Sequence, residues 1–165
     1  MAWYTTIAKL YRWIQPKPSR YSQGGWWTIL LDRESNEPYL VRYYLLSTRW
    51  LERWFPKLSY HLVLHNTLKS DVDGLHDHPW NWASRILSGG YWENTPEGRF
   101  WRCRTEGWRS RKGEDFHRLE LDDRISDETW SLFLMGPRYK EWGFINKHGK
   151  WVQWKEYIDN RSIHL

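Results

Sequence analysis

Short segments rich in Trp, Tyr, Val, Ile and Leu recur along most of this chain, with turn residues between them. Aromatic and β-branched residues favour strands, whereas glycine, proline, asparagine and aspartate interrupt them. This spacing predicts an all-β chain folded as an antiparallel sandwich or barrel. The expected strands cover residues 26–31, 39–46, 60–68, 80–88, 100–105, 116–121, 130–135 and 150–154.

The first 25 residues are expected to form an extension outside the barrel. A short helix over 5–14 would place its apolar side chains on one side, and Pro16 and Pro18 follow it. We therefore divide the chain into an extension, 1–25, and one barrel domain, 26–165. A length of 165 residues suits a single compact domain.

The chain is basic, with a net charge of +5, and arginines alternate with aromatic residues between 99 and 112. Such a pattern suits a groove for single-stranded nucleic acid. The alternative is a solvated hairpin whose arginines pair with neighbours such as Glu106, Glu114 and Asp115. Arg102 and Arg104 would share one strand face, so either is also a candidate contact for an acidic substrate.

Cysteine usage and hydropathy indicate the compartment. Cys103 is the only cysteine, so the sequence has neither a disulfide framework nor a cysteine metal cluster. No apolar run approaches the length of a membrane span, and the first residues lack the order of a signal peptide. We expect a cytoplasmic protein, in a cell or in an infected host, that does not bind membranes.

Two histidines separated by one residue are the strongest functional signal. On a strand, His76 and His78 would share a side and Asp77 would face away. The same alternation would place Trp80 and Trp82 beside the histidines. The alternative without a metal is a polar strand end whose histidine rings are solvated. A third histidine, His117, follows a glycine-led turn further along the chain, which makes a three-ligand metal site plausible.

The order of these motifs resembles the cupin superfamily, RmlC-like jelly-roll barrels (double-stranded β-helices) that usually bind one divalent metal. The run 38–157 also resembles an uncharacterised cupin-like group of bacteria and phages. The blocks that carry this likeness are 39–43, 64–65, 70–73, 75–80 (Leu-His-Asp-His-Pro-Trp), 89–91, 117–118 and 136–144 (Gly-Pro-Arg-Tyr-Lys-Glu-Trp-Gly-Phe). The resemblance implies a cupin-like jelly roll in which His76, His78 and His117 are metal ligands.

One departure from the general cupin pattern narrows the expected ligand set. The pattern has a glutamate three or four residues after the second histidine, and positions 81–83 here hold no carboxylate. The chain is in this respect similar to three-histidine cupins such as the thiol dioxygenases. Three neutral nitrogen ligands suit Fe(II), which we favour, and also Zn, Ni, Mn or Co. His65 is a candidate fourth ligand or substrate contact.

The turn that begins at Gly136-Pro137 supplies candidate catalytic groups. Arg138 would bind an acid group of the substrate, and Glu141 would move protons. The alternative is that these two residues pair with each other. The remaining candidates are expected to contact substrate: His65, Trp80, Trp82, Arg102 and Arg104.

These features favour a metal-dependent cupin enzyme, with oxygenase chemistry on a small polar or acidic molecule as the leading class. A Zn or Ni cupin that acts as an isomerase, lyase or hydrolase is the first alternative. A non-catalytic cupin that binds a sugar or nucleotide is the second, and a phage accessory protein that binds nucleic acid is the third. A homodimer is compatible with all of them.

Overall fold

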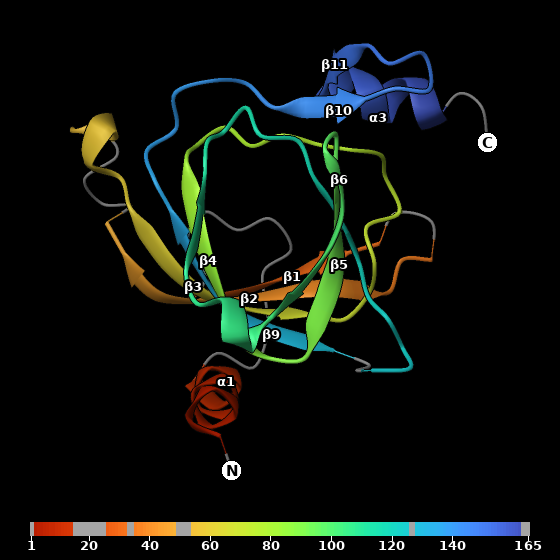
Figure 1. Cartoon of the computed structure of the whole chain (residues 1–165). Helices are drawn as coiled ribbons and strands as arrows, with labels where there is room; N and C mark the ends of the chain where they lie inside the picture. The colour runs from red at the N-terminus through yellow and green to blue at the C-terminus, as the bar shows by residue number, and fades with distance from the viewer. Residues whose placement is uncertain (1, 15–25, 33–34, 49–53, 126–127, 163–165) are drawn as a thin grey trace.

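The computed structural model describes residues 2–14, 26–32, 35–48, 54–125 and 128–162. Its strands form two curved antiparallel sheets that face each other around a barrel (Figure 1). The larger sheet has the order β1-β2-β3-β9-β4-β7. Its strands are β1 (Trp27–Leu31), β2 (Pro38–Ser47), β3 (His61–Thr67), β9 (Thr129–Met135), β4 (Trp82–Ser88) and β7 (Arg109–Arg111).

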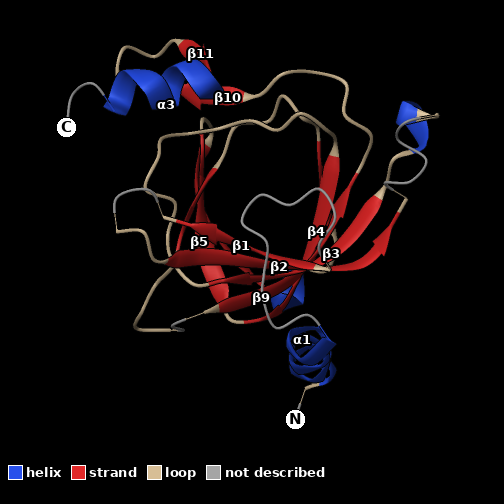
Figure 2. Ribbon diagram, turned by 180° about the vertical axis from the view of Figure 1, so that it is seen from behind, coloured by secondary structure: helices blue, strands red, loops and turns tan. Residues whose placement is uncertain are grey.

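The smaller sheet has the order β6-β5-β8, and a separate pair of strands, β10 and β11, precedes a C-terminal helix. The α1 helix and the unit made by β10, β11 and α3 lie on opposite sides of the barrel (Figures 1 and 2). The bounds of these elements are β5 Gly90–Thr95, β6 Gly98–Cys103, β8 Arg118–Glu120, β10 Gly143–Ile145, β11 Trp151–Gln153, α1 Trp3–Ile14 and α3 Trp154–Ser162. No described helix has the length and apolar character needed to cross a bilayer.

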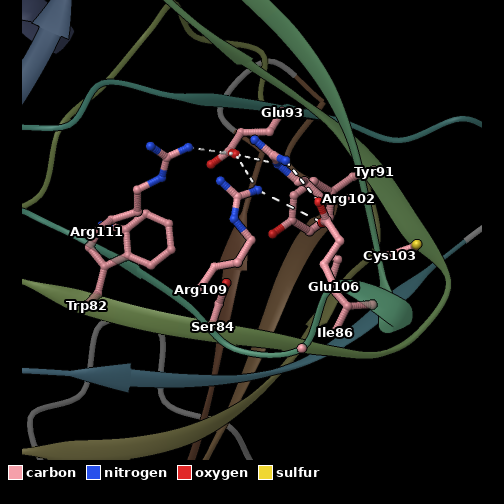
Figure 3. A pocket seen from close by; sticks show the side chains of 11 residues that line it. Trp82, Ser84, Ile86, Tyr91, Glu93, Arg102, Cys103, Glu106, Arg109 and Arg111 are labelled. Carbon is pink, nitrogen blue, oxygen red and sulfur yellow. Dashed lines mark hydrogen bonds and ion pairs between the residues drawn. The ribbon is translucent and has the colours of Figure 1, made fainter.

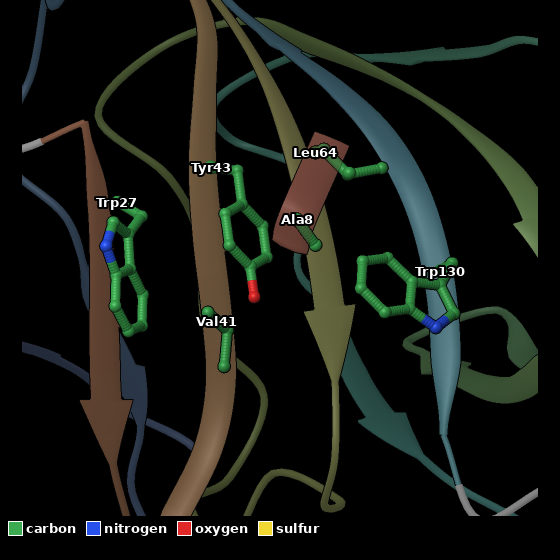
Figure 4. Packing of buried hydrophobic residues seen from close by; sticks show 6 residues of the cluster. All are labelled: Ala8, Trp27, Val41, Tyr43, Leu64 and Trp130. Carbon is green, nitrogen blue, oxygen red and sulfur yellow. The ribbon is translucent and has the colours of Figure 1, made fainter. Parts of the chain in front are cut away.

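The main hydrophobic cluster lies between α1 and the outer face of the larger sheet. Tyr43 and Leu64 are completely buried there and are direct cross-strand partners on β2 and β3. The Tyr43 ring stacks between Trp27 and Trp130, with ring centroids 5.9 Å and 6.3 Å away (Figure 4). Ala8 of α1 belongs to the same cluster and brings the helix against the sheet. The helix therefore covers an apolar surface that an isolated barrel would expose.

Strand alternation then decides what faces the inside of the barrel. Arg42 and His65 are the next cross-strand pair along β2 and β3, so they face the opposite way from Tyr43 and Leu64. Which of the two alternating sets on β3 faces inward cannot be read from the sequence. The structure places the apolar set under α1 and His65 inside, where its ring stacks on Phe133 at 4.8 Å.

The structure confirms the expected all-β jelly roll and corrects several details. Strands β5, β7 and β10 and helix α3 were not expected. The sequence predicted a strand over 150–154, but the strand there ends at Gln153 and the chain continues as a helix from Trp154. β6 ends at Cys103 and a 3-10 turn follows, so Arg102 and Arg104 do not share a strand face. The division at residue 25 stays a prediction, and 15–25 lie outside the described residues.

Candidate metal centre

The His76–His78 segment is positioned by backbone pairing outside the regular strands. His76 and His117 exchange two backbone hydrogen bonds, of 2.9 and 3.0 Å, and form an isolated bridge. The His78 amide donates to the Gly113 carbonyl at 2.9 Å. The expectation of a strand at this point was therefore wrong, because β4 begins only at Trp82. The bridge nevertheless sets the two histidine segments side by side.

Asp77 faces away from its histidine neighbours, as alternation predicts, and anchors the segment from behind. Its side chain is 2% exposed. It accepts hydrogen bonds from the Gly143 amide at 2.7 Å and from Trp151 Nε1 at 3.3 Å, and it pairs with Lys140. Because these partners belong to the C-terminal part of the chain, Asp77 ties the β10–β11 unit to the back of the candidate centre.

The three histidine rings converge on one point. One ring nitrogen of each of His76, His78 and His117 lies within 4.8 Å of the others. Nε2 of His78 and Nε2 of His117 are 2.8 Å apart. Nδ1 of His76 is buried and has no hydrogen-bond partner in the described structure. Buried polar nitrogens normally have partners, so an unpartnered histidine nitrogen within this cluster is unusual for a purely structural arrangement.

Burial also favours the form of the rings that binds metal. Burial lowers the pKa of His76, a shift that the carboxylate of Asp71 opposes. Burial lowers the pKa of His78 well below its usual value, and the neighbouring His117 lowers it further. Neutral imidazole is the form that ligates a metal ion. The two rings are therefore held in the ligating form at neutral pH.

Glu93 of β5 orients the third ring from the side opposite the other histidines. Its carboxylate, 3% exposed, lies 3.1 Å from Nδ1 of His117. A proton on Nδ1 donates to this carboxylate and directs Nε2 toward His78, the side on which a metal ion would bind, as carboxylates behind metal-binding histidines commonly do. Glu93 was not among the residues expected at the site, although it lies only two residues after the Tyr91 of a motif block.

Three arginines surround the same carboxylate (Figure 3). Arg102, Arg109 and Arg111 place guanidinium nitrogens 2.8, 3.2 and 3.1 Å from Oε2 of Glu93. Burial alone would raise the pKa of Glu93, but the hydrogen bond with His117 and the positive charges of Arg111 and Arg102 lower it to about 2. Glu93 is therefore ionised at neutral pH. The many arginines between 99 and 112 are the feature of the sequence that could have indicated a buried carboxylate such as Glu93.

The donor set fits one divalent metal ion. Three convergent imidazoles, one of them hydrogen-bonded to a carboxylate, are a recognised ligand arrangement for Fe(II), Zn and related ions. At the positions where the general cupin pattern has glutamate, Asn81 accepts a hydrogen bond from the Gly113 amide at 3.0 Å. Trp82 packs its ring 5.0 Å from that of His117. Neither residue adds a carboxylate ligand.

A cavity of about 350 Å³ opens beside His76 and His78. Its wall has aromatic surface from Trp80, Trp142 and Trp154, and it has charged groups of both signs. The charged side chains that line it are Arg42, Arg138, Asp32, Asp71 and Asp73. This volume suits a small molecule, and aromatic walls with a few polar groups are typical of ligand sites.

The other predicted site residues are distributed between this cavity and its surroundings. Trp80 lines the cavity, whereas Trp82 lies behind it, with its ring 5.4 Å from that of His78. Arg138 lines the cavity and pairs with Glu141, which is the alternative considered for these two residues. His65 does not line it. Burial, and next the charge of Arg42, lower the pKa of His65 well below its usual value.

The arginine-rich hairpin is largely neutralised by acidic neighbours. Arg102 contacts Glu93 and Glu106, and Arg99 contacts Glu120 at 2.8 Å. Neither Arg102 nor Arg104 lines the cavity beside the histidines. Substrate contacts by these two arginines stay a prediction without geometric support. The ion pairs match the paired arrangement expected as the alternative, although Arg102 is only 13% exposed and so is not solvated.

Comparisons with solved structures identify the class of fold. A cupin-2 domain protein from Rhodospirillum rubrum superposes with a TM-score of 0.54 and 15% identity, covering 82% of this chain and 87% of the other. A cupin-2 conserved barrel domain protein from Rhodopseudomonas palustris gives 0.54 and 12%, covering 81% and 87%. A protein of unknown function with a cupin-like fold from Ralstonia eutropha gives 0.50 and 12%, covering 88% and 89%.

The chain therefore has a cupin-like jelly-roll fold, as the motif order predicted. No family model matches the sequence, and no curated protein matches it. Because identities this low establish the fold alone, the function has to be argued from the site.

Proposed function

We propose that this protein is a metal-dependent enzyme with one divalent ion held by His76, His78 and His117, and that it oxidises a small polar or acidic molecule with dioxygen. The observation that carries this proposal is the convergence of three imidazoles, two of them on the wall of a cavity of about 350 Å³. A ferrous ion, when bound there, would supply the redox chemistry that lets dioxygen react with an organic substrate.

The chain's own residues would prepare the site for that chemistry. Glu93 holds the His117 ring in one tautomer through the 3.1 Å contact with Nδ1. Trp80 and Trp82 surround the His78 ring at 6.3 and 5.4 Å and limit the access of water. A dry, aromatic wall protects a reactive site from side reactions with solvent. The open side of the centre faces the cavity, where a substrate would bind.

Metal analysis tests the centre directly. The purified full chain is reconstituted with Fe(II) and analysed by plasma mass spectrometry beside the His76→Ala/His117→Ala variant. His148→Ala is the matched control, because His148 is exposed in a turn away from the centre. We expect close to one metal per chain in the wild type and in the control, and loss of metal in the double variant. Absence of metal from the reconstituted wild type would refute the proposal.

The identity of the metal separates the reaction classes. Iron, together with oxygen uptake in the presence of small acids, would support the oxygenase. Retention of zinc or nickel in place of iron, with no oxygen uptake, would favour isomerase, lyase or hydrolase chemistry at the same three histidines, where a metal raises the acidity of bound water.

A non-catalytic binding role is the second candidate, and one observation favours it. Trp142 and Trp154 both line the cavity and stack on each other, with ring centroids 5.8 Å apart and planes at 12°. Aromatic faces of this kind bind sugar rings and bases. Binding of a nucleoside or monosaccharide that is unchanged in the metal-free double variant, without turnover in the wild type, would support this role against the enzyme.

A further inference from the structure

Arg42 is a cation inside the barrel that no described residue neutralises. It projects inward from β2 and lines the cavity beside His76 and His78. Its Nε is buried and has no hydrogen-bond partner in the described structure. No ion pair joins Arg42 to a described carboxylate, whereas Arg102 and Arg111 both contact Glu93. Burying an unpaired guanidinium N–H is costly, so an acceptor is missing from this position.

The surroundings of Arg42 place the missing acceptor beside the candidate metal centre. Its cross-strand partner is His65, whose ring stacks on Phe133 at 4.8 Å. The Phe133 ring in turn lies 6.3 Å from that of His78. Nε2 of His65 is also buried without a partner. Two unsatisfied polar groups therefore lie near His78, and Arg42 is the one that reaches the cavity wall.

The charges of the cavity select the chemistry of the ligand. Among the described residues that line the cavity, the other cation is Arg138, which is paired with Glu141, so Arg42 is the one available to an anion. Asp71 also lines the cavity, and its Oδ2 accepts a hydrogen bond at 2.8 Å from the amide of Leu119, the second residue after His117. Because Asp32, Asp71 and Asp73 line the same cavity, a single guanidinium suits a monoanion and disfavours a phosphate dianion. The planar guanidinium fork also matches a carboxylate in two parallel hydrogen bonds.

We infer that Arg42 binds the carboxylate of a small organic acid in this cavity and directs the rest of that molecule toward the three histidines. The inference deepens the proposed function and rests on it for the chemistry that follows binding. It names a different anion contact from the ones expected from the sequence, which were Arg102, Arg104 and Arg138.

A ligand panel on the full chain tests the inference. The probes are mono- and dicarboxylates of about three to eight carbons, their neutral amides, and inorganic phosphate, each at about 10 mM in a thermal-shift assay. We expect at least one carboxylate to raise the Tm of the wild type by about 3 °C, and its amide to have no effect. No shift with any carboxylate, equal shifts with acid and amide, or a larger shift with phosphate would overturn the inference.

Substitutions then locate the contact. For the carboxylate that binds, Arg42→Met is expected to raise the Kd at least about tenfold, because a charged hydrogen-bond partner is lost. Arg42→Lys keeps the charge without the planar fork and is expected to give a smaller increase. Arg85→Met is the matched control, since Arg85 is exposed on β4. An unchanged Kd in Arg42→Met, or an equal loss in Arg85→Met, would overturn the inference.

The ligand-free variants and their metal content separate this inference from the proposed function. Arg42→Met without ligand is expected to be at least as stable as the wild type, because an unpaired cation is removed. A clear fall in Tm would instead assign Arg42 a structural role. Carboxylate binding through Arg42 in a protein that takes up no metal would uphold the inference and refute the enzyme. Metal uptake without carboxylate binding would refute the inference about Arg42 and leave the proposed enzyme standing.

Discussion

Replacing Glu93 with glutamine should weaken both the fold and the candidate metal centre, because one carboxylate supports them together. Its Oε1 accepts the proton of His117 Nδ1, and its Oε2 neutralises Arg102, Arg109 and Arg111. Glutamine keeps the shape of the side chain and an acceptor oxygen but removes the charge. Arg102 and Arg109 would keep their contacts with Glu106, but Arg111 would lose its carboxylate partner and no anion would join all three guanidinium groups.

Two independent estimates give the size of the stability loss. Removing one partner of a buried ion pair typically costs about 3–5 kcal/mol. A pKa of about 2 for Glu93, against a usual value of 4.5, corresponds to about 3 kcal/mol. Because the folded-state pKa is the lower one, this contribution is fully present above pH 4.5 and is lost as the pH falls toward 2. The wild type should therefore lose its advantage over Glu93→Gln in acid.

Urea unfolding of metal-free protein at pH 7 and pH 3 measures this difference, and a metal titration at pH 7 measures the effect on the centre. We expect a loss of about 3 kcal/mol at pH 7, a smaller one at pH 3, and metal affinity about 10–100-fold lower. Glu120→Gln is the control, because Glu120 pairs with Arg99 on the exposed surface and should cost under about 1 kcal/mol. Equal effects of the two substitutions would refute the reasoning.

Three further predictions concern other parts of the structure. Asp77→Asn should lower the free energy of unfolding by about 3 kcal/mol in urea, since the partly buried Lys140 loses the charge of its buried partner; a change under about 1 kcal/mol, of the order of an exposed pair, would contradict it. Leu64→Ala should cost about 2–5 kcal/mol, because Leu64 is fully buried under α1, and an unchanged urea midpoint would show that α1 does not pack there. Chelation should lower the Tm of metal-loaded wild type but not of His76→Ala; equal shifts would place the metal elsewhere.

Much of the fold followed from local patterns. Segments with alternating apolar residues and turn residues between them predict strands, and eight were expected close to strands that the structure contains. β5 was missed because Gly89 and Gly90 read as the end of a strand, whereas the chain turns there and continues directly into the next one. Helix α3 was missed because its first residue, Trp154, was counted in the expected strand 150–154, since Trp favours strands when packing is ignored.

The histidine spacing determined by itself that His76 and His78 can act together, since residues two apart on extended backbone share a side. Only the tertiary structure brought His117 against them, through backbone bridges between segments far apart in the chain. It also decided that Glu93 supports His117 and that Arg42 faces the cavity. The physical reason is that alternation specifies which residues share a face, whereas the packing of α1 and the closure of the barrel determine which face becomes the inside.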